Sequence, residues 1–280
     1  QILALRLLNC GFYDNAIVCG VDVVTPFIVA GFLSFKSLSM TECRPFDIDR
    51  TGLNLGEAAA TIILSNSNHA TGKSKWQLCS GAMSNDAYHV SAPSPKGDGS
   101  CRALEQVLIG VNINDLALLS THGTATMFND QMESKAIDRM SLAELPISAL
   151  KGYYGHTLGA AGVLETIITM RAMDDGIILG VRGFEEIGVS GKINISAKER
   201  TTDKHSFLKM ISGFGGCNGA LLYSKRTASS VDMVDRSILH TQHNVKINQQ
   251  SISVDGEYLH FSETGKALLT EVYKEQIGEY

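Results

Sequence analysis

The stretch that decides the fold is Lys151-Gly-Tyr-Tyr-Gly-His156-Thr-Leu-Gly-Ala-Ala-Gly162, which places a histidine just before a helix. Apolar residues recur at helical spacing over residues 163–172, so we expect an amphipathic helix there. The small residues 159–162 at its start let another backbone or a ligand come close. Because the positive end of a helix disfavours a protonated imidazole, His156 is suited to donating a hydrogen bond to a carbonyl or an oxyanion.

A second histidine follows a neighbouring strand pattern. The wholly apolar run 116–119 is typical of a parallel strand buried on both faces, and Thr121-His122-Gly-Thr-Ala-Thr126 comes directly after it. Residues 146–150 form a similar strand before the first stretch. Since open α/β sheets bind ligands at the carboxyl ends of their strands, we expect His122 and His156 to share one site.

The rest of the chain alternates between strand and helix patterns, which predicts an α/β fold. A helix opens the sequence at residues 2–8, and another, capped by Ser100, spans residues 102–109. Asp130 and Glu133 give a capping pattern for a helix that ends near Arg139. Further strands are expected at residues 16–21, 58–65, 76–83, 177–181, 192–196, 206–212 and 220–225.

Changes of composition along the chain predict three segments. A polar, turn-rich stretch near residue 70 separates residues 1–68 from residues 69–226. Residues 227–280 alternate in hydrophobicity up to an Asp255-Gly256 turn and then give an amphipathic pattern around Leu268. We therefore expect the last segment to be an appendage made of a strand hairpin and a helix.

Composition and charge argue against several classes of function. The net charge of −5 and the lack of a basic run do not suit binding to nucleic acid or to an anionic membrane surface. No apolar run is long enough to span a membrane. The six cysteines lie far apart without a CxxC pair, which argues against disulfides and zinc. We expect a cytoplasmic protein with reduced thiols and no metal or cofactor.

Five motifs, in order, resemble those of the β-ketoacyl synthases. They are Cys43-Arg-Pro-Phe-Asp47 with Gly56-Glu57, Asp86-Ala-Tyr-His-Val-Ser-Ala-Pro93, Thr121-His-Gly-Thr-Ala-Thr126 with Asn129-Asp130, Lys151 to Gly162, and Gly213-Phe-Gly-Gly-Cys-Asn218. Each motif alone is weak, but the ordered set is specific. The resemblance implies a thiolase-like fold with layers in the order αβαβα, of which the N-terminal half is only partly present here.

The same resemblance implies the activity of a 3-oxoacyl-(acyl-carrier-protein) synthase, an acyltransferase of fatty-acid or polyketide synthesis. Such an enzyme holds an acyl group on a cysteine and condenses it with malonyl on an acyl carrier protein, with loss of carbon dioxide. That chemistry requires a thiolate nucleophile and donors for two oxyanions. The implied partners are an acyl carrier protein and a second subunit, in a homodimer or a ketosynthase-like heterodimer.

The resemblance also assigns the catalytic residues. His122 and His156 are expected to bind the malonyl carbonyl and to stabilise the enolate, while Lys151 holds the hydrogen-bond network around them. Glu57 is expected to belong to that network. From the residues alone, a structural ion pair of Glu57 with Arg44 or Arg50 is the simpler interpretation, because a carboxylate beside an apolar strand needs a partner.

Further positions are expected to bind substrate by the same resemblance. Thr124 and Thr126 would line the channel of the carrier arm, and Phe214 would be the gate residue of its glycine-rich loop. Asn218 belongs to the same loop motif and is also expected at the substrate site. Ala125 stands where the family usually has glycine, so we expect its methyl group to narrow the channel.

The nucleophilic cysteine of the family has no counterpart among these residues. The family places it on the turn before the helix that ends here near Gly11, roughly half a dozen residues before Gln1. Cys217 lies in a glycine-rich turn and is expected to be a buried structural thiol. Because the sequence starts without Met inside a helix, we expect a piece of a longer protein that is catalytically incomplete alone.

Two other hypotheses stay open. The first is a non-catalytic ketosynthase-like partner of the chain-length-factor type, which would lack the nucleophile. The presence of His122, Lys151 and His156 argues against it, because a subunit without catalysis has no physical need for all three. The second is a half-fold that serves only as a dimerisation or binding module.

Overall fold

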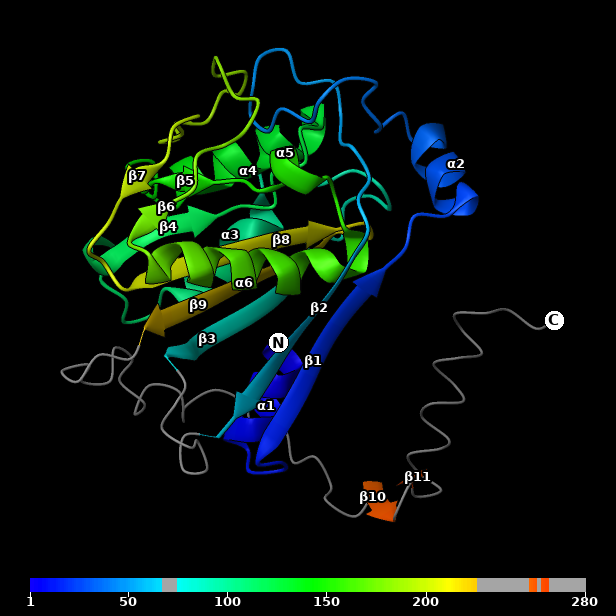
Figure 1. Ribbon diagram of the computed structural model, residues 1–280, viewed down its shortest axis with the longest axis vertical. Coiled ribbons are helices and arrows are strands. Elements are labelled where there is room, and N and C mark those ends of the chain that lie inside the picture. Colours follow the sequence, from blue (N-terminus) through cyan, green and yellow to red (C-terminus); the bar gives the residue numbers. More distant parts are fainter. Residues whose placement is uncertain (67–74, 226–251, 256–257, 262–280) are drawn as a thin grey trace. The chain divides into compact units, whose positions relative to one another are not determined.

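The computed structural model describes residues 1–66, 75–225, 252–255 and 258–261 (Figure 1). The chain divides into two compact units, Gln1–Val234 and Asp235–Tyr280. In the second unit, β10 (Ile252–Asp255) pairs with β11 (Tyr258–Phe261) in antiparallel register, and the expected appendage of hairpin and helix stays a prediction. The helix expected around Leu268 and the boundary expected near residue 68 lie outside the described residues.

A mixed sheet of five strands, in the order β3-β9-β8-β4-β5, forms the centre of the first unit. Strand β4 runs parallel to its two neighbours, β5 and β8, and the other two pairings are antiparallel. All five residues of β4 are buried, as predicted for a strand covered on both faces. The strands are β3 (Trp76–Asn85), β4 (Leu116–Ser120), β5 (Ile147–Ser148), β8 (Ser206–Gly213) and β9 (Cys217–Lys225).

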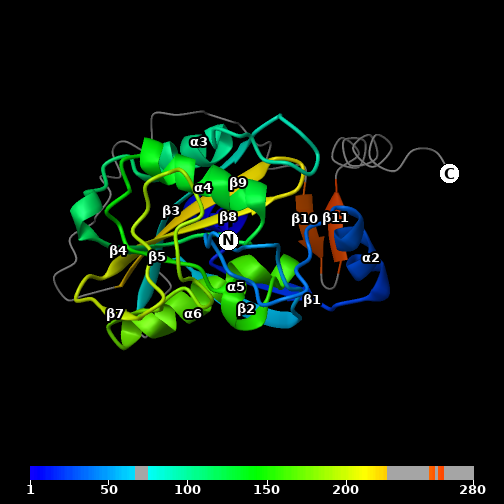
Figure 2. The ribbon, with the colours of Figure 1, turned by 90° about the horizontal axis from the view of Figure 1, so that it is seen from above.

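Helices cover both faces of this sheet, which confirms the α/β class (Figure 2). On one face, α3 (Asp98–Val107) packs against β3 and β9, and α4 (Met127–Arg139) packs against α3. On the other face lie α1 (Ile2–Asn9) and α6 (Ala161–Asp174), whose Ile2 and Met173 share a core cluster with Leu118 of β4. In this part of the chain, no helix has the length and apolar character needed to cross a membrane.

A two-stranded ribbon contacts α1 and α6 on the side away from the five-stranded sheet. It consists of β1 (Asn15–Asp22) and β2 (Ala58–Ser65), which pair in antiparallel register over their whole length. The described part of the first unit therefore has four layers: helices, sheet, helices and ribbon. The remaining elements are α2 (Pro26–Ser34), η1 (Ile113–Asp115), α5 (Lys151–Tyr154), η2 (Leu158–Ala160), β6 (Ile177–Ile178) and β7 (Arg200–Thr201).

The sheet has a hydrophobic core on each face because successive side chains of a strand point in opposite directions. On β4, Leu119 belongs to the core beneath α3 and α4, together with Leu104 and Ile137. Its neighbour Leu118 belongs to the core on the α6 side, together with Phe207. Burial of each such side chain stabilises the fold by about 1.5–3 kcal/mol, so the carboxyl end of β4 has a rigid support.

Three expected elements differ in the structure. The helix expected to begin near Ser100 starts at Asp98, after Gly97 in left-handed conformation (φ +68°), so Ser100 lies inside α3. The helix with Asp130 and Glu133 starts earlier, at Met127, and these acids do not cap it. The strand expected at residues 192–196 is reduced to one bridge, because β5 is only two residues long and offers little edge for pairing.

Candidate active site

His122 and His156 lie side by side, although different strands deliver them. His122 is the second residue after β4, and His156 lies between α5 and η2 after β5. Their ring centroids are 4.9 Å apart, with an angle of 79° between the ring planes. The exposed fractions are 5% and 9%. The prediction that the two histidines share a site is therefore confirmed.

Backbone contacts fix the position and the tautomer of His156. Its N–H donates to the carbonyl of Asn54 (2.7 Å), and its carbonyl accepts from Gly56 N (3.0 Å). The backbone N–H of Leu158 donates to His156 Nδ1 (3.1 Å), so the neutral ring carries its proton on Nε2. Burial, followed by the charge of Lys151, lowers the pKa of His156 to about 3. Burial, rather than the helix end, is thus the main cause of its neutrality.

Lys151 sets the tautomer of His122. Its Nζ lies 3.2 Å from His122 Nδ1, 2.5 Å from the carbonyl oxygen of His122 and 2.6 Å from Glu165 Oε1. An ammonium group has three N–H donors and no acceptor, so His122 Nδ1 must accept and the ring proton must be on Nε2. Burial and then Lys151 lower the pKa of His122 well below its ordinary value. Both histidines are therefore neutral donors through Nε2.

A buried glutamate joins Lys151 to a second lysine. Glu165, on α6, binds Lys151 through Oε1 and Lys209 of β8 through Oε2, at 2.6 and 2.5 Å. All three side chains are at most 1% exposed. Burial alone would raise the pKa of Glu165, but the two lysines bring it below its ordinary value. A buried group of one carboxylate and two ammonium groups therefore lies directly behind the histidines.

The structure corrects the network role expected for Glu57. This side chain is exposed, and its Oε2 accepts a hydrogen bond from the backbone N–H of Val24 (2.8 Å). It does not form the alternative ion pair either, since Arg44 pairs with Asp47 and Glu185. The physical reason is position: Glu57 directly precedes β2 at the surface, so water solvates its charge.

Glu165 and Lys209 were not among the expected site residues. A signal for Lys209 exists, because a charged residue between Leu208 and Met210 interrupts an apolar strand and must find a partner. Glu165 gives a weaker signal, since a glutamate in an amphipathic helix usually faces water. Only the packing of α6 against the sheet makes Glu165 a buried residue.

A second buried glutamate holds the backbone of the His122 loop. Glu133 Oε1 accepts from His122 N and its Oε2 accepts from Gly123 N, both at 2.7 Å. Asp130 Oδ1 accepts from Thr124 N at 3.0 Å. These acids bond to the loop instead of capping their own helix. Burial and then the charge of Asp130 raise the pKa of Glu133 to about 7.

The tight loop after His122 has two special backbone positions. Gly123 has φ +46°, and a Cβ there would lie 2.7 Å from the Cβ of Ala149, so a side chain does not fit. Ala125 is buried with φ +59°, a conformation that costs a non-glycine residue about 1–2 kcal/mol. The hydroxyls of Thr124 and Thr126 lie 2.9 Å apart. Their expected role as channel residues stays a prediction.

Phe214 lies in the short turn between β8 and β9. Its side chain is 51% exposed and stacks on Phe32 of α2, with ring centroids 5.8 Å apart. Phe35 meets it edge to face at 5.2 Å. An exposed aromatic ring on a glycine-rich turn can move without disturbing the core, so the position suits the predicted gate.

The side chain of Asn218 is buried and forms hydrogen bonds within the chain. Its Nδ2 donates to Asp86 Oδ1 and to the carbonyl of Gly216, at 2.7 and 2.9 Å. Its Oδ1 accepts from the hydroxyls of Ser100 and Ser212, at 2.9 and 3.0 Å. An amide side chain has two donors and two acceptor positions, and all four are used within the chain. Asn218 therefore anchors the turn, and its expected contact with substrate stays a prediction.

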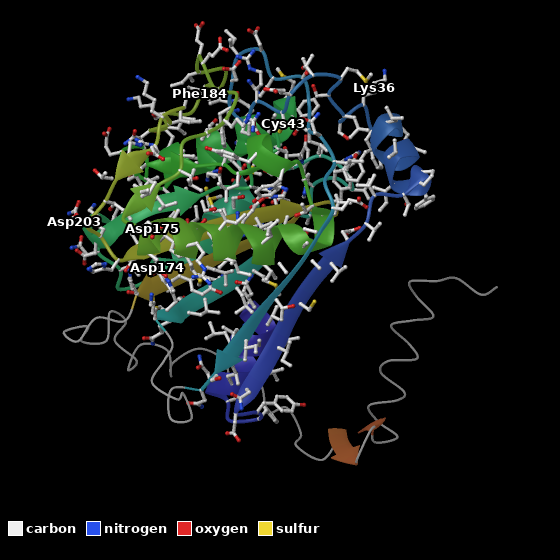
Figure 3. All side chains as sticks on the ribbon, viewed as in Figure 1. Lys36, Cys43, Asp174, Asp175, Phe184 and Asp203 are labelled. Carbon is white, nitrogen blue, oxygen red and sulfur yellow. The ribbon has the colours of Figure 1, made fainter. Side chains whose placement is uncertain are left out.

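The cysteine that contacts the His122 loop is a buried thiol, whose Sγ lies 3.8 Å from the carbonyl oxygen of Thr124. Cys43 lies in the connection between α2 and β2 (Figure 3), and burial, followed by Asp130, raises its pKa to about 12. Cys217 is exposed rather than buried, because the turn before it leaves its side chain at the surface. In the described ranges, no group of three or more His, Cys, Asp and Glu residues is arranged to hold a metal ion.

Two family profiles match the chain in order. One is described as the beta-ketoacyl synthase N-terminal domain, at residues 2–70, and the other as the C-terminal domain, at residues 77–185. The 3-oxoacyl-(acyl-carrier-protein) synthase 2 of Rhizobium meliloti is 31% identical over 241 residues, which cover 80% of this chain and 57% of that protein. The chain thus spans somewhat more than half the length of this relative.

Solved structures show the same similarity. A β-ketoacyl synthase from Burkholderia phymatum matches with a TM-score of 0.76 at 28% identity, over 80% of this chain and 58% of that one. A structure of the ketosynthase ApeO in complex with its chain length factor ApeC, from Xenorhabdus doucetiae, matches with a TM-score of 0.74 at 31% identity, over 80% and 56%. The thiolase-like fold expected from the motifs is therefore confirmed. With both domain profiles present in order, the chain belongs to the β-ketoacyl synthase family.

Proposed function

We propose that the protein catalyses the decarboxylative condensation of an acyl thioester with malonyl carried by an acyl carrier protein. The observation that supports this most directly is the pair of neutral histidines, which offer two Nε2–H donors within a buried site. When the malonyl thioester loses carbon dioxide, the bonding electrons move onto the thioester oxygen as an enolate. Fixed donors in a water-poor site stabilise such an oxyanion strongly.

The roles of the residues follow from their hydrogen bonds. His122 and His156 donate to the thioester oxygen and transfer no proton, because each ring already accepts at Nδ1. The enolate carbon then attacks the acyl thioester, and the thiolate leaves. Lys151 keeps the His122 proton on Nε2 and is a positioning residue.

The other expected substrate residues fit this reaction as proposals. Thr124 and Thr126 lie directly after His122, where a phosphopantetheine arm would reach the histidines. Phe214 would open and close the acyl side of the site by movement of its glycine-rich turn. Since the relative from Rhizobium meliloti is named 3-oxoacyl-(acyl-carrier-protein) synthase 2, we infer an acyl carrier protein as the partner.

The acyl-carrying cysteine can be located by experiment. Full-length protein is treated with a cysteine-directed acyl-chain mimic such as cerulenin, and the adduct is mapped by peptide mass spectrometry. We expect one specific cysteine adduct that spares Cys43, because burial raises the pKa of the Cys43 thiol to about 12. Absence of any adduct would count against a ketosynthase that acts alone.

The enolate role is tested by His156→Ala in the full-length protein. Removal of one oxyanion donor typically lowers the rate by ~10²-fold or more, so malonyl decarboxylation should fall at least that far. His205→Ala is the matched control, because this histidine is exposed at the start of β8. A decarboxylation rate within a few-fold of wild type for His156→Ala would show that the assigned role is wrong.

A non-catalytic subunit of the chain-length-factor type is the second candidate. The match to the structure of ApeO with its chain length factor ApeC is consistent with this candidate but does not favour it. Complete hydrogen bonding around His122 and Lys151 argues for an active subunit. Purified protein that decarboxylates malonyl without a second polypeptide would decide for the enzyme, and light scattering would give its oligomeric state.

A further inference from the structure

Lys209 places a positive charge in the core of the sheet. It lies in the middle of β8, and its neighbours Leu208 and Met210 are buried. Its side chain is 1% exposed. In the parallel pairing of β8 with β4, Lys209 is opposite Ser120, the last residue of β4. The ammonium group therefore lies beside the loop that carries His122.

Three oxygen atoms surround this ammonium group. Lys209 Nζ lies 2.5 Å from Glu165 Oε2, 3.0 Å from the carbonyl oxygen of Thr121 and 3.5 Å from that of Ser120. Since an ammonium group has three N–H donors, each donor has one acceptor. Lys209 thus links α6 to the carbonyl groups at the end of β4.

The second lysine determines how Glu165 uses its two oxygen atoms. Glu165 has one negative charge and each lysine has one positive charge, so the group Lys151–Glu165–Lys209 has an excess of one positive charge. Without Lys209, both oxygen atoms of Glu165 would be free to turn to Lys151. The ammonium group of Lys151 would then be drawn away from His122 Nδ1, which is its longest contact at 3.2 Å.

We propose that Lys209 is a positioning residue for His122. Its ammonium group holds Glu165 Oε2 and the carbonyl groups at the end of β4, so that Lys151 keeps its hydrogen bond to His122 Nδ1 and the Nε2 proton stays directed toward the enolate. The excess positive charge also favours the anionic enolate. The inference rests on the proposed function, and it adds a residue that acts on the reaction through two others.

The charge of Lys209 allows a test that a purely structural residue would not affect, namely the pH dependence of the decarboxylation rate. The charge of Lys209 helps to lower the pKa of both His122 and His156, after burial and Lys151. Loss of that charge should raise both pKa values, so the acid limb of the pH–rate profile should move to higher pH. The titratable groups that face the histidines from the surrounding elements are Lys151 of α5, Glu165 of α6, Asp130 and Glu133 of α4, and Lys209 of β8.

The test compares Lys209→Met with wild type in malonyl decarboxylation by the full-length protein. Outer hydrogen-bond partners that orient metal ligands typically lower activity by about 10- to 100-fold when they are removed. By the same reasoning, we expect a decrease of that order in the decarboxylation rate together with the shifted acid limb. Lys225→Met is the matched control: this lysine, on the next strand, pairs at 3.0 Å with Asp174 at the other end of α6 (Figure 3). It should retain the wild-type rate and profile.

A second variant keeps the test decisive if Lys209→Met does not fold. Lys209→Ala leaves space for propylammonium, which replaces the missing atoms with their charge, whereas 1-propanol replaces the volume without it. We expect propylammonium, and not propanol, to restore decarboxylation. A wild-type rate and profile for Lys209→Met, or no difference between the two additives, would overturn the role of Lys209. An inactive wild-type protein would instead overturn the proposed function.

Discussion

Two buried glutamates that support His122 differ in ionisation: Glu133 bonds directly to the His122 loop, whereas Glu165 acts through Lys151. Their helices, α4 and α6, lie on opposite faces of the sheet (Figure 2). Glu165, on α6, lies between two ammonium groups, which bring its pKa below the ordinary value although burial raises it. Glu133, on α4, accepts backbone N–H groups, and burial together with Asp130 raises its pKa to about 7.

The difference shows what is needed to keep a buried carboxylate ionised. Backbone dipoles are partial charges, and they do not offset the loss of water around Glu133 when another acid is near. Two full positive charges do so for Glu165. The side chain of His122 is therefore held by a group that stays charged at neutral pH, while its backbone is held by a group that titrates there.

The strongest test of this comparison is Glu165→Ala. It leaves two buried ammonium groups without their counter-charge, and loss of one partner of a buried ion pair typically costs about 3–5 kcal/mol. Urea unfolding of the full-length protein at pH 7 should give a decrease of this size in the free energy of unfolding. Glu165→Gln keeps the shape without the charge and should lose most of the same stability. A loss below about 1 kcal/mol for Glu165→Gln would contradict the ionic explanation.

The pH dependence should have opposite signs for the two acids. For Glu133, the folded pKa of about 7 exceeds the unfolded value near 4.3, so the folded state binds more protons between them. Its contribution to stability should fall by roughly 3 kcal/mol as pH rises from about 4.3 to 7. For Glu165, the folded pKa is lowered, so its contribution is present above the unfolded value and is lost as pH falls through the folded pKa.

These signs can be read from two variants. The stability difference between wild type and Glu133→Gln should shrink as pH rises toward 7, whereas the difference between wild type and Glu165→Gln should shrink as pH falls below about 4.3. Urea unfolding at a series of pH values gives both curves. Parallel curves would show that the two environments do not differ as described.

At fixed pH 7, Glu133→Gln should have a smaller effect than the Glu165 variants. The glutamine keeps one acceptor oxygen and turns an N–H group toward a backbone N–H, which leaves a buried donor unsatisfied at a cost of about 1–3 kcal/mol. The measurement is again the free energy of unfolding in urea. A loss larger than that of Glu165→Gln would reverse the ranking of the two sites.

Asp98 is an acid at the surface, and we expect its substitution to have the smallest effect on the free energy of unfolding. Asp98 pairs with Arg139 at 2.8 Å, and both side chains are almost half exposed. Water screens such a pair, so Asp98→Asn should change the free energy of unfolding by less than about 1 kcal/mol. High salt should reduce even that effect, while it should leave the loss for Glu165→Ala nearly unchanged. A salt-sensitive loss for Glu165→Ala would mean that water reaches the buried group.

The convergence of the two histidines could be predicted from the sequence. It needs only the order of the elements and the rule that parallel strands place their carboxyl ends together. The residues 116–119 and 146–150 carried that information, and β4 and β5 are indeed neighbours in the sheet. The helix at α1 and the strand β2 followed from local periodicity in the same way.

The charged group behind the histidines could not be predicted in full. Which acid pairs with Lys151 depends on how α6 lies on the sheet, and periodicity treats Glu165 as an ordinary polar residue of a helix. Glu57 was expected to form an ion pair because it stands next to an apolar strand, yet its side chain is exposed to water. Asp130 and Glu133 matched a capping pattern because the pattern records spacing and not the loop that the side chains reach.

The backbone bridge between Leu55 and His156 joins segments that are far apart in the sequence. Gly56 N–H and His156 N–H donate across it in opposite directions, so separation of the two segments must break both bonds at once. A hydrogen-bonded amide exchanges with deuterated solvent only when its bond opens. If these two amides take up deuterium at one common rate, that rate is the rate at which His156 separates from the segment before β2. The measurement does not depend on turnover.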